Sequence, residues 1–82
     1  MNSQLLSELK QVFIKVFKDT DHNDFHYDLK MNDIPQWDSL ANFNFLMTIE
    51  EHFEIQFDIN DMSDLNSIRS IYEKIEHIKK YT

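Results

Sequence analysis

Hydrophobic residues recur at helical spacing in two segments, one near each end of the chain. Near the start, Leu5, Leu6, Leu9, Val12, Phe13, Val16 and Phe17 fall on one face at 3.6 residues per turn. Near the end, Ile68, Ile71, Tyr72, Ile75 and Ile78 form a second stripe. Asn2 or Ser3 is the expected N-cap of the first helix, and Asn66 or Ser67 precedes the last. The pattern predicts a helix in each segment.

A third predicted helix begins at Asp38-Ser39 and carries two apolar stripes. Phe45, Leu46, Ile49 and Phe53 form one stripe, which we expect to face the core. Leu40, Phe43 and Met47 lie roughly opposite, on the side of Asn44, Glu50, Glu51 and Glu54. Those carboxylates would be costly to bury, so the second stripe is expected to be exposed and to serve as a docking surface. The alternative is that a fourth segment covers it.

The segments between these helices are polar. Phe25, Tyr27, Leu29 and Met31 alternate within the long connection 18–37, a pattern that is compatible with a strand. A lone strand would leave its backbone unpaired, so we expect an extended loop that places apolar side chains in the core. Asn60 or Asp61 is expected to open a short helix that holds Met62 and Leu65. The predicted fold is all-α, with three long helices, one short helix and a long loop between the first two.

Composition limits the class of protein. Eighty-two residues allow one domain, residues 1–82, and 41% of them are hydrophobic. Glycine and cysteine are absent and there is one proline, which favours helices and excludes disulfides and thiolate ligands. The chain has no apolar run near the roughly 20 residues of a membrane span, and its first residues do not resemble a signal peptide. We therefore expect a cytoplasmic monomer without membrane insertion.

The net charge of −7 is concentrated in the middle of the chain. Residues 21–40 carry five acids against Lys30, and residues 41–60 carry four acids and no Lys or Arg. This distribution argues against nucleic acid as a partner, because nucleic-acid binding needs a basic surface. It fits docking to basic patches on other proteins, and it fits equally a surface that only keeps the chain soluble.

Motifs for catalysis and metal binding are incomplete. Residues 19–23 place oxygens as a calcium loop does, but Asp24 stands where that loop has glycine and Lys30 where it has glutamate. His22 and His26 have no third ligand at fixed spacing. Ser39 lies outside a G-x-S-x-G elbow, and no histidine is placed by sequence to activate it. We expect neither an enzyme nor a metal site.

The tetrapeptide Trp37-Asp38-Ser39-Leu40 remains as the candidate for chemistry. It places a serine hydroxyl at a helix start, between an irregular acidic segment and the apolar, acidic face. Ser and Asp are also the commonest N-caps, because their side-chain oxygens accept bonds from first-turn N–H groups. Capping alone would therefore explain the tetrapeptide. A chemical role for Ser39 needs support from the surrounding residues.

These parts together resemble the acyl carrier proteins, in particular small stand-alone carriers outside housekeeping fatty acid synthesis. Residues 33–40, D-I-P-Q-W-D-S-L, are similar to the carrier-site motif D-I-x-G-W-D-S-L. Glu50-Glu51-His52-Phe53 matches an E-E-x-F run at the family's distance from the serine, and residues 65–68 match the entry to its final helix. The resemblance covers about residues 3–78 and implies an acyl-carrier-type four-helix bundle.

The resemblance also implies roles for particular residues. Ser39 would carry 4′-phosphopantetheine, derived from coenzyme A, and the thiol of this arm would hold an acyl or aminoacyl group as a thioester. Asp38 would orient the transferase complex and cap the helix, and Trp37 would pack the loop or line the arm. Partner enzymes would read a face made of Leu40, Phe43, Met47, Glu50, Glu51 and Glu54.

The partners implied are a phosphopantetheinyl transferase, a loading ligase for acyl or aminoacyl groups, and a downstream acyltransferase or synthase of a specialised pathway. The alternative is a helical interaction module that has the carrier fold but no arm. Several positions depart from the family. Gln36 and Glu54 stand where glycine is usual, Asn42 and Asn44 stand where many fatty-acid carriers have acids, and Phe43 is larger than the common valine. A left-handed conformation at Gln36 or Glu54 would cost roughly 1 kcal/mol.

Overall fold

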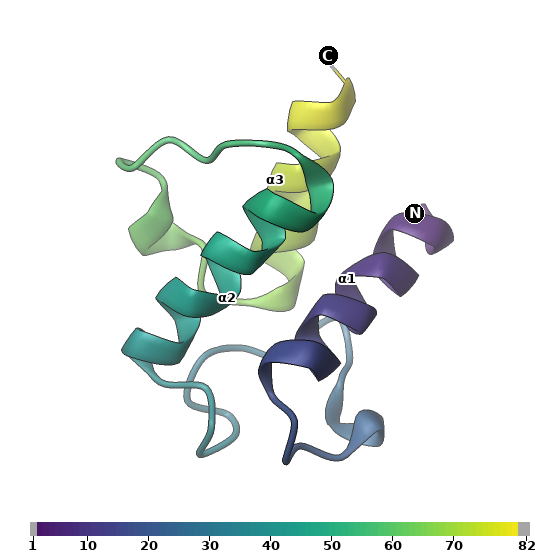
Figure 1. Cartoon of the computed structure of the whole chain (residues 1–82), viewed down its shortest axis with the longest axis vertical. Helices are drawn as coiled ribbons and strands as arrows, with labels where there is room; N and C mark the ends of the chain where they lie inside the picture. Colours follow the sequence, from purple (N-terminus) through teal and green to yellow (C-terminus); the bar gives the residue numbers. More distant parts are fainter. Residues whose placement is uncertain (1, 81–82) are drawn as a thin grey trace.

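Three α helices form the frame of the molecule: α1 (Ser3–Val16), α2 (Ser39–Phe53) and α3 (Ile68–Lys80) (Figure 1). The computed structural model describes residues 2–80, apart from the side chains of His22 and Lys80. The long loop between α1 and α2 lies at the end of the molecule away from the chain termini, and α2 begins at that end (Figure 1). The expected all-α fold is confirmed over the described residues.

Side chains cap the first and last helices where the sequence places polar residues. Asn2 Oδ1 accepts the Leu5 N–H at 3.0 Å, so Asn2 is the N-cap of α1. Ser67 Oγ accepts the Ser70 N–H at 3.0 Å and does the same for α3. Each bond satisfies a first-turn donor that has no partner within its helix.

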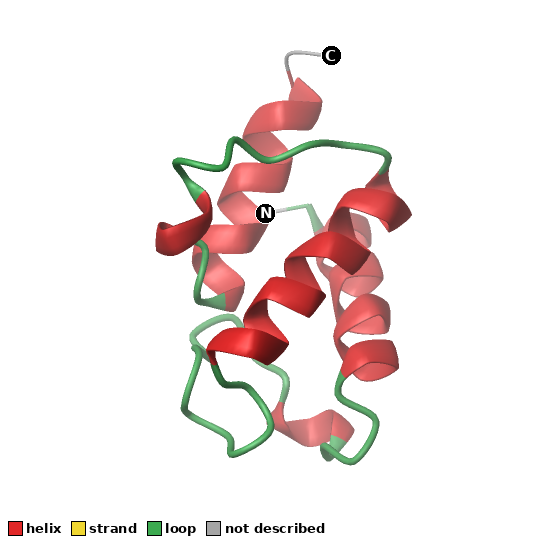
Figure 2. Cartoon of the chain, turned by 60° about the vertical axis from the view of Figure 1, so that its left-hand side comes forward, coloured by secondary structure: helices red, strands yellow, loops and turns green. Residues whose placement is uncertain are grey.

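The short helix predicted near residue 62 is present only as one turn, so the fold does not reach the predicted count of four helices. The segment forms a single 3₁₀ turn, η2 (Met62–Asp64), and a second such turn, η1 (His22–Asp24), lies in the long loop (Figure 2). Asp61 precedes η2 but makes no capping bond with its side chain. Because helix nucleation is costly, a polar segment with two apolar residues and no cap does not extend beyond one turn. Over the described residues the fold therefore has three helices and two 3₁₀ turns.

The long loop is anchored to the segment that enters α3. Lys30 and Ser67 form an isolated antiparallel bridge. The Met31 N–H donates to Asn66 O at 2.8 Å, and the Ile68 N–H donates to Leu29 O at 2.9 Å. Leu29 is buried, while Phe25, Tyr27 and Met31 pack partly buried against the core. The expected loop with apolar side chains in the core is confirmed, and its backbone finds a partner that the sequence pattern does not show.

Arg69, in the first turn of α3, adds a second contact to this loop. Its guanidinium donates to Asp28 Oδ1 at 2.6 Å and lies 4.7 Å from the centre of the Tyr27 ring. The hydrogen bond and the positive charge lower the pKa of the Asp28 carboxyl. Both members of the pair are exposed, so the pair contributes little to stability and mainly fixes position.

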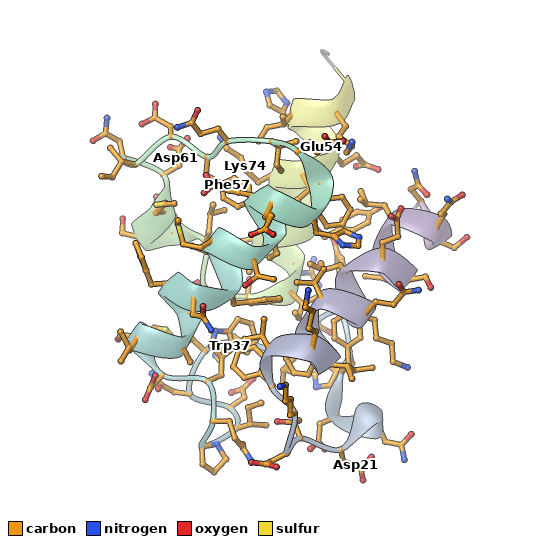
Figure 3. All side chains as sticks on the ribbon, viewed as in Figure 1. Asp21, Trp37, Glu54, Phe57, Asp61 and Lys74 are labelled. Atoms are coloured by element: carbon orange, nitrogen blue, oxygen red, sulfur yellow. The ribbon has the colours of Figure 1, made fainter. Side chains whose placement is uncertain are left out.

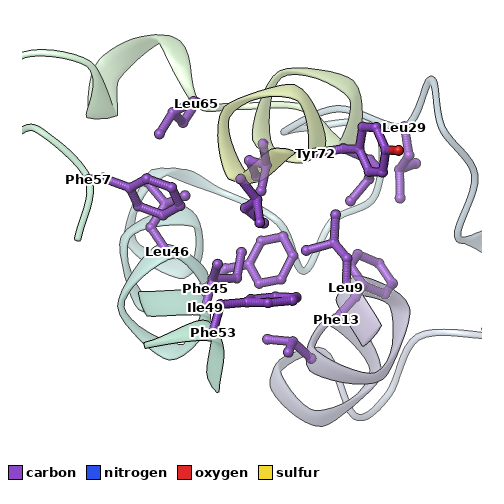
Figure 4. Close-up of a cluster of buried hydrophobic side chains, with 14 of the residues drawn as sticks. Leu9, Phe13, Leu29, Phe45, Leu46, Ile49, Phe53, Phe57, Leu65 and Tyr72 are labelled. Atoms are coloured by element: carbon purple, nitrogen blue, oxygen red, sulfur yellow. The ribbon is translucent and has the colours of Figure 1, made fainter. Parts of the chain in front are cut away.

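The three helices and the loop share one hydrophobic core. Leu9 and Phe13 from α1 face Phe45 and Ile49 from α2, with Tyr72 of α3 beside them (Figure 4). Burying one such side chain stabilises the fold by about 1.5–3 kcal/mol. The stripe of α2 that was predicted to face the core is therefore the side that packs into it. The loop residues Leu29 and Trp37 belong to the same core, so α2 and the loop are held together.

Backbone strain occurs at Glu54, one of the two positions, with Gln36, at which the acyl carrier proteins that this chain resembles usually have glycine. Glu54, the C-cap residue directly after α2, has φ 55° and ψ 48°, in the left-handed region. Its N–H and that of Ile55 both reach Glu50 O, as in a helix end closed by glycine. Among the described residues, positive φ occurs otherwise at Asn32, which tolerates it, and Gln36 is not affected.

Glycine at position 54 should therefore stabilise the protein. We expect Glu54→Gly to raise the free energy of unfolding by about 1 kcal/mol, because glycine adopts the left-handed conformation without a Cβ clash. Gln36→Gly is the matched control and should lower it by about 0.5 kcal/mol, through the added freedom of the unfolded chain. Urea unfolding followed by circular dichroism measures both. Equal losses in the two variants would contradict strain at Glu54.

Candidate functional site

Asp38 and Ser39 have different roles at the start of α2. Asp38 has an extended conformation, and its Oδ1 accepts the Ala41 N–H at 2.8 Å, so Asp38 is the N-cap. Ser39 is the first helical residue and is exposed. Its hydroxyl makes no hydrogen bond to any described residue. Capping therefore does not account for Ser39, whose hydroxyl remains available at the surface.

Trp37 packs the loop and lines no surface. Its side chain is 0% exposed. Its ring lies 5.7 Å from the ring of Phe45 in α2, and 6.1 and 5.8 Å from those of Phe13 and Phe17 at the end of α1. Figure 3 shows Trp37 between these two helices. The sequence left two roles open for Trp37, packing the loop or lining the arm. The structure supports packing. A group attached to Ser39 would find no exposed indole surface to contact.

Asn42 has a structural role that the sequence interpretation missed, because it treated this residue only as a departure from the family. The Trp37 Nε1–H donates to Asn42 Oδ1 at 2.9 Å, and Asn42 Nδ2 donates to Leu65 O at 3.0 Å. Asn42 is 8% exposed, so both bonds are buried. Its position could have been found, because it precedes Phe45, Leu46 and Ile49 in the register of the core stripe. A polar residue in that register needs buried partners.

An open hollow lies directly beside Ser39. Ser39, Asn42, Phe43 and Leu46 of α2 form one side of it, and Met62, Ser63 and Asn66 form the other. Met31 of the long loop completes the lining. The hollow thus joins three segments that the Asn42 hydrogen bonds and the Lys30–Ser67 bridge hold together.

The second apolar stripe of α2 is exposed, as predicted. Leu40, Phe43 and Met47 are 81%, 55% and 47% exposed, and no described segment covers them. A shallow depression along α2, lined by these three residues with Gln36, Asp38, Ala41 and Asn44, shows that they form one continuous strip. We call Leu40, Phe43 and Met47 the apolar strip. It begins next to Ser39 and runs along the helix.

The three glutamates near the end of α2 are not equivalent. Glu51 and Glu54 are exposed, whereas Glu50 is half-buried and its Oε2 accepts the Phe57 N–H at 2.7 Å. Glu50 therefore anchors the loop that follows α2, a structural role separate from the partner contact expected of it. Asp61, further along this loop, forms an ion pair with Lys74 of α3 at 2.8 Å (Figure 3). The loop also presents Ile59, an exposed residue that the sequence interpretation did not single out.

The stretch of chain that contains Ser39 carries an excess of acidic residues. The segment from residue 31 to residue 68 contains eight Asp and Glu residues and no Lys or Arg. It supplies the start of α2, the apolar strip and the far side of the hollow. A surface of one sign attracts molecules of opposite charge and speeds their association.

The described residues include no group of three His, Cys, Asp or Glu placed to hold a metal ion. His22 has no described side chain, so the His22–His26 pair lies in part outside the described residues. Over the same part of the chain, no helix combines the length and apolar character that crossing a membrane requires.

Comparison of the chain with protein-family models, curated protein sequences and solved structures finds no significant match. The geometry at Ser39 and the motif around it therefore carry the functional argument.

The Trp37–Asn42 bond can be tested with a double-mutant cycle. We expect Asn42→Leu to lower the free energy of unfolding by about 2 kcal/mol, because it leaves the buried Trp37 N–H and the Leu65 carbonyl without partners. In a Trp37→Phe background, which lacks the N–H, the same change should cost about 1 kcal/mol less. Urea unfolding of the four proteins gives the coupling energy. Additive losses would mean that the bond contributes nothing to stability.

Proposed function

We propose that this protein is an acyl carrier that holds its cargo on a 4′-phosphopantetheine arm at Ser39. The observation that carries the proposal is the exposed Ser39 hydroxyl, which is not used for capping and lies at the start of α2 beside the apolar strip. The carrier-like motif of residues 33–40 supplies the identity of the group. The all-α fold agrees with an acyl-carrier-type bundle, although η2 replaces its short helix.

The residues at Ser39 fit attachment of this group. The hydroxyl is reachable from solvent, and Asp38 holds the helix start in place through its bond to Ala41. Attachment forms a bond between Ser39 Oγ and a phosphorus of coenzyme A as the phosphate–phosphate linkage breaks, adenosine 3′,5′-bisphosphate leaves and a base of the transferase takes the proton. The group supplies a terminal thiol for a thioester, which this cysteine-free chain cannot supply itself.

The apolar strip and its acidic surroundings support a role in docking. A phosphopantetheinyl transferase, a loading ligase and a downstream acyltransferase or synthase must each reach Ser39. The negative segment 31–68 would steer basic patches of such enzymes, and the apolar strip would provide the contact that desolvates on binding. Asp38, Glu51 and Glu54 are exposed and available for these contacts. The proposed place of action is the cytoplasm.

A helical interaction module without the arm is the second candidate. The exposure of the apolar strip favours it independently of Ser39, because the strip would bind a protein partner whether or not Ser39 is modified. Function in the cell separates the two: a Ser39→Ala strain loses function if the protein is a carrier and keeps it if the protein only docks.

Modification of Ser39 can be measured by intact mass. We expect the purified protein, incubated with coenzyme A and a broad-specificity phosphopantetheinyl transferase, to gain the mass of one phosphopantetheine group. Ser39→Ala should gain none, while Ser63→Ala, which removes a hydroxyl from the other side of the hollow, should load normally. Failure of the wild-type protein to load, under conditions that load a control carrier, would refute the proposal.

The apolar strip can be tested with a charge substitution. Met47→Glu should change the free energy of unfolding by less than about 0.5 kcal/mol, because Met47 lies outside the core and about half of it is exposed. It should nevertheless lower the kcat/KM of the transferase or of a loading ligase by about tenfold or more, because it places a carboxylate in the apolar contact.

Ser7→Glu is the matched control, since it adds the same charge at an exposed position of α1. It should leave both stability and kcat/KM close to wild type. Equal effects of the two substitutions on kcat/KM would show that net charge, and not the strip, governs recognition.

A further inference from the structure

The hollow beside Ser39 has an uncharged lining, although it is built from the acidic stretch of the chain. The segment from residue 31 to residue 68 contains eight acids and no Lys or Arg, yet none of the described residues that line the hollow is charged. A negative group inside the hollow therefore meets neither a carboxylate nor a cation of the lining. An uncharged hydrogen-bond donor is then the kind of side chain that can bind it.

The size of the hollow limits which part of an attached group it can hold. Its volume is about 290 Å³, just below the range of roughly 300–1,000 Å³ for sites that enclose drug-sized ligands. Because Ser39 itself lines the hollow, a group attached to its hydroxyl begins there, and only the portion nearest the serine fits. In phosphopantetheine this portion is the phosphate, followed by a carbon chain with two methyl groups on one carbon.

Two polar side chains of the lining are available to such a group. The Asn42 amide is already engaged in two buried hydrogen bonds. The side chains of Ser63 and Asn66 are exposed and make no hydrogen bond to any described residue. Exposed side chains change rotamer within picoseconds to nanoseconds, so each of these two can turn toward the hollow.

Asn66 is the better placed of the two donors. Its backbone carbonyl accepts the Met31 N–H at 2.8 Å. The preceding carbonyl, that of Leu65, accepts the bond from Asn42 Nδ2. Ser63 lies instead in η2, a single turn without a side-chain cap. Because the backbone at Asn66 is fixed before anything binds, a hydrogen bond from its amide costs less conformational freedom.

Three side chains, Met31, Phe43 and Met62, form the apolar walls of the hollow. Contact with these walls removes the two methyl groups next to the phosphate from water, which favours their binding. Phe43 belongs to the apolar strip as well, and it lines the depression along α2. A group held in the hollow therefore lies directly beside the surface that we propose for docking.

We propose that the hollow holds the near end of the phosphopantetheine arm, with the Asn66 amide donating to the phosphate and the apolar walls against the two methyl groups. The start of α2 favours the same placement, because the dipole of a helix is positive at this end and attracts a negative group. The inference rests on the proposed carrier function. It makes Asn66 a positioning residue, which sets the direction in which the arm leaves Ser39.

The experiment compares the full chain before and after loading from coenzyme A. Loading should raise the melting temperature by about 4 °C, the shift that one added hydrogen bond gives in a domain of this length. In NMR spectra of the loaded form, the two methyl groups of the arm should show nuclear Overhauser contacts with the Phe43 ring and the Met62 methyl group. They should show none with Leu40 or Met47, which lie outside the hollow.

Two substitutions at Asn66 test the donor. Asn66→Ala removes it and should abolish both the temperature shift and the contacts. Asn66→Asp puts a carboxylate of the same size in its place and should reverse the shift, so that loading lowers the melting temperature, because two negative groups then face each other. Asn44→Asp is the matched control, since it adds the same charge at an exposed asparagine of α2 outside the hollow. It should keep the shift, as should Ser63→Ala.

The outcomes separate this inference from the proposed function. If the wild-type protein loads but shows neither the shift nor the contacts, the arm lies outside the hollow and the inference is overturned, while the carrier function stands. A shift that survives in Asn66→Asp, or that Ser63→Ala also abolishes, would overturn the assignment of the donor to Asn66. If the wild-type protein does not load under conditions that load a control carrier, the carrier function fails and the inference fails with it.

Discussion

The indole of Trp37 is completely buried, so its N–H must find an acceptor inside the protein. Asn42 Oδ1 is this acceptor, and Asn42 Nδ2 donates a second hydrogen bond to the carbonyl of Leu65. Three segments that are distant in sequence, the long loop, α2 and the entry to α3, are thereby joined at one point. The Asn32 N–H closes the loop onto Trp37 O at 2.7 Å, which places Asp38 at the helix start and Ser39 just beyond it. The exposed serine thus depends on a buried tryptophan two residues earlier.

The two sides of α2 follow from the same anchoring. Phe45 and Ile49 are fixed in the core, so Leu40, Phe43 and Met47 are turned to solvent, where they remain uncovered by the described chain. Exposed apolar residues on an acidic helix contribute little to folding and are typical of surfaces that bind other proteins. The core contacts and the proposed docking contacts therefore lie on opposite faces of one helix, so a change in the proposed docking contacts leaves the core undisturbed.

Much of the fold and part of the site were predictable from local pattern. The 3.6-residue spacing of apolar positions placed all three helices, and it separated the core stripe of α2 from the exposed one. The short helix expected near residue 62 forms only one 3₁₀ turn, because a cap residue in the sequence does not ensure a capping bond: Asp61 instead pairs with Lys74. Glu50 was expected at the surface but also holds the Phe57 N–H, a partner set by the path of the loop.

The sequence by itself determined the helices, the acidic middle of the chain and the candidate serine, because periodicity, charge and motif are local properties. Only the tertiary structure decided that the Ser39 hydroxyl is left available beside the expected cap Asp38, that Trp37 is core, and that Asn42 joins the loop to the entry of α3. It also decided that Glu54, and not Gln36, adopts the left-handed conformation. These features depend on which buried groups meet in space, and a buried donor or acceptor selects its partner by proximity in the fold.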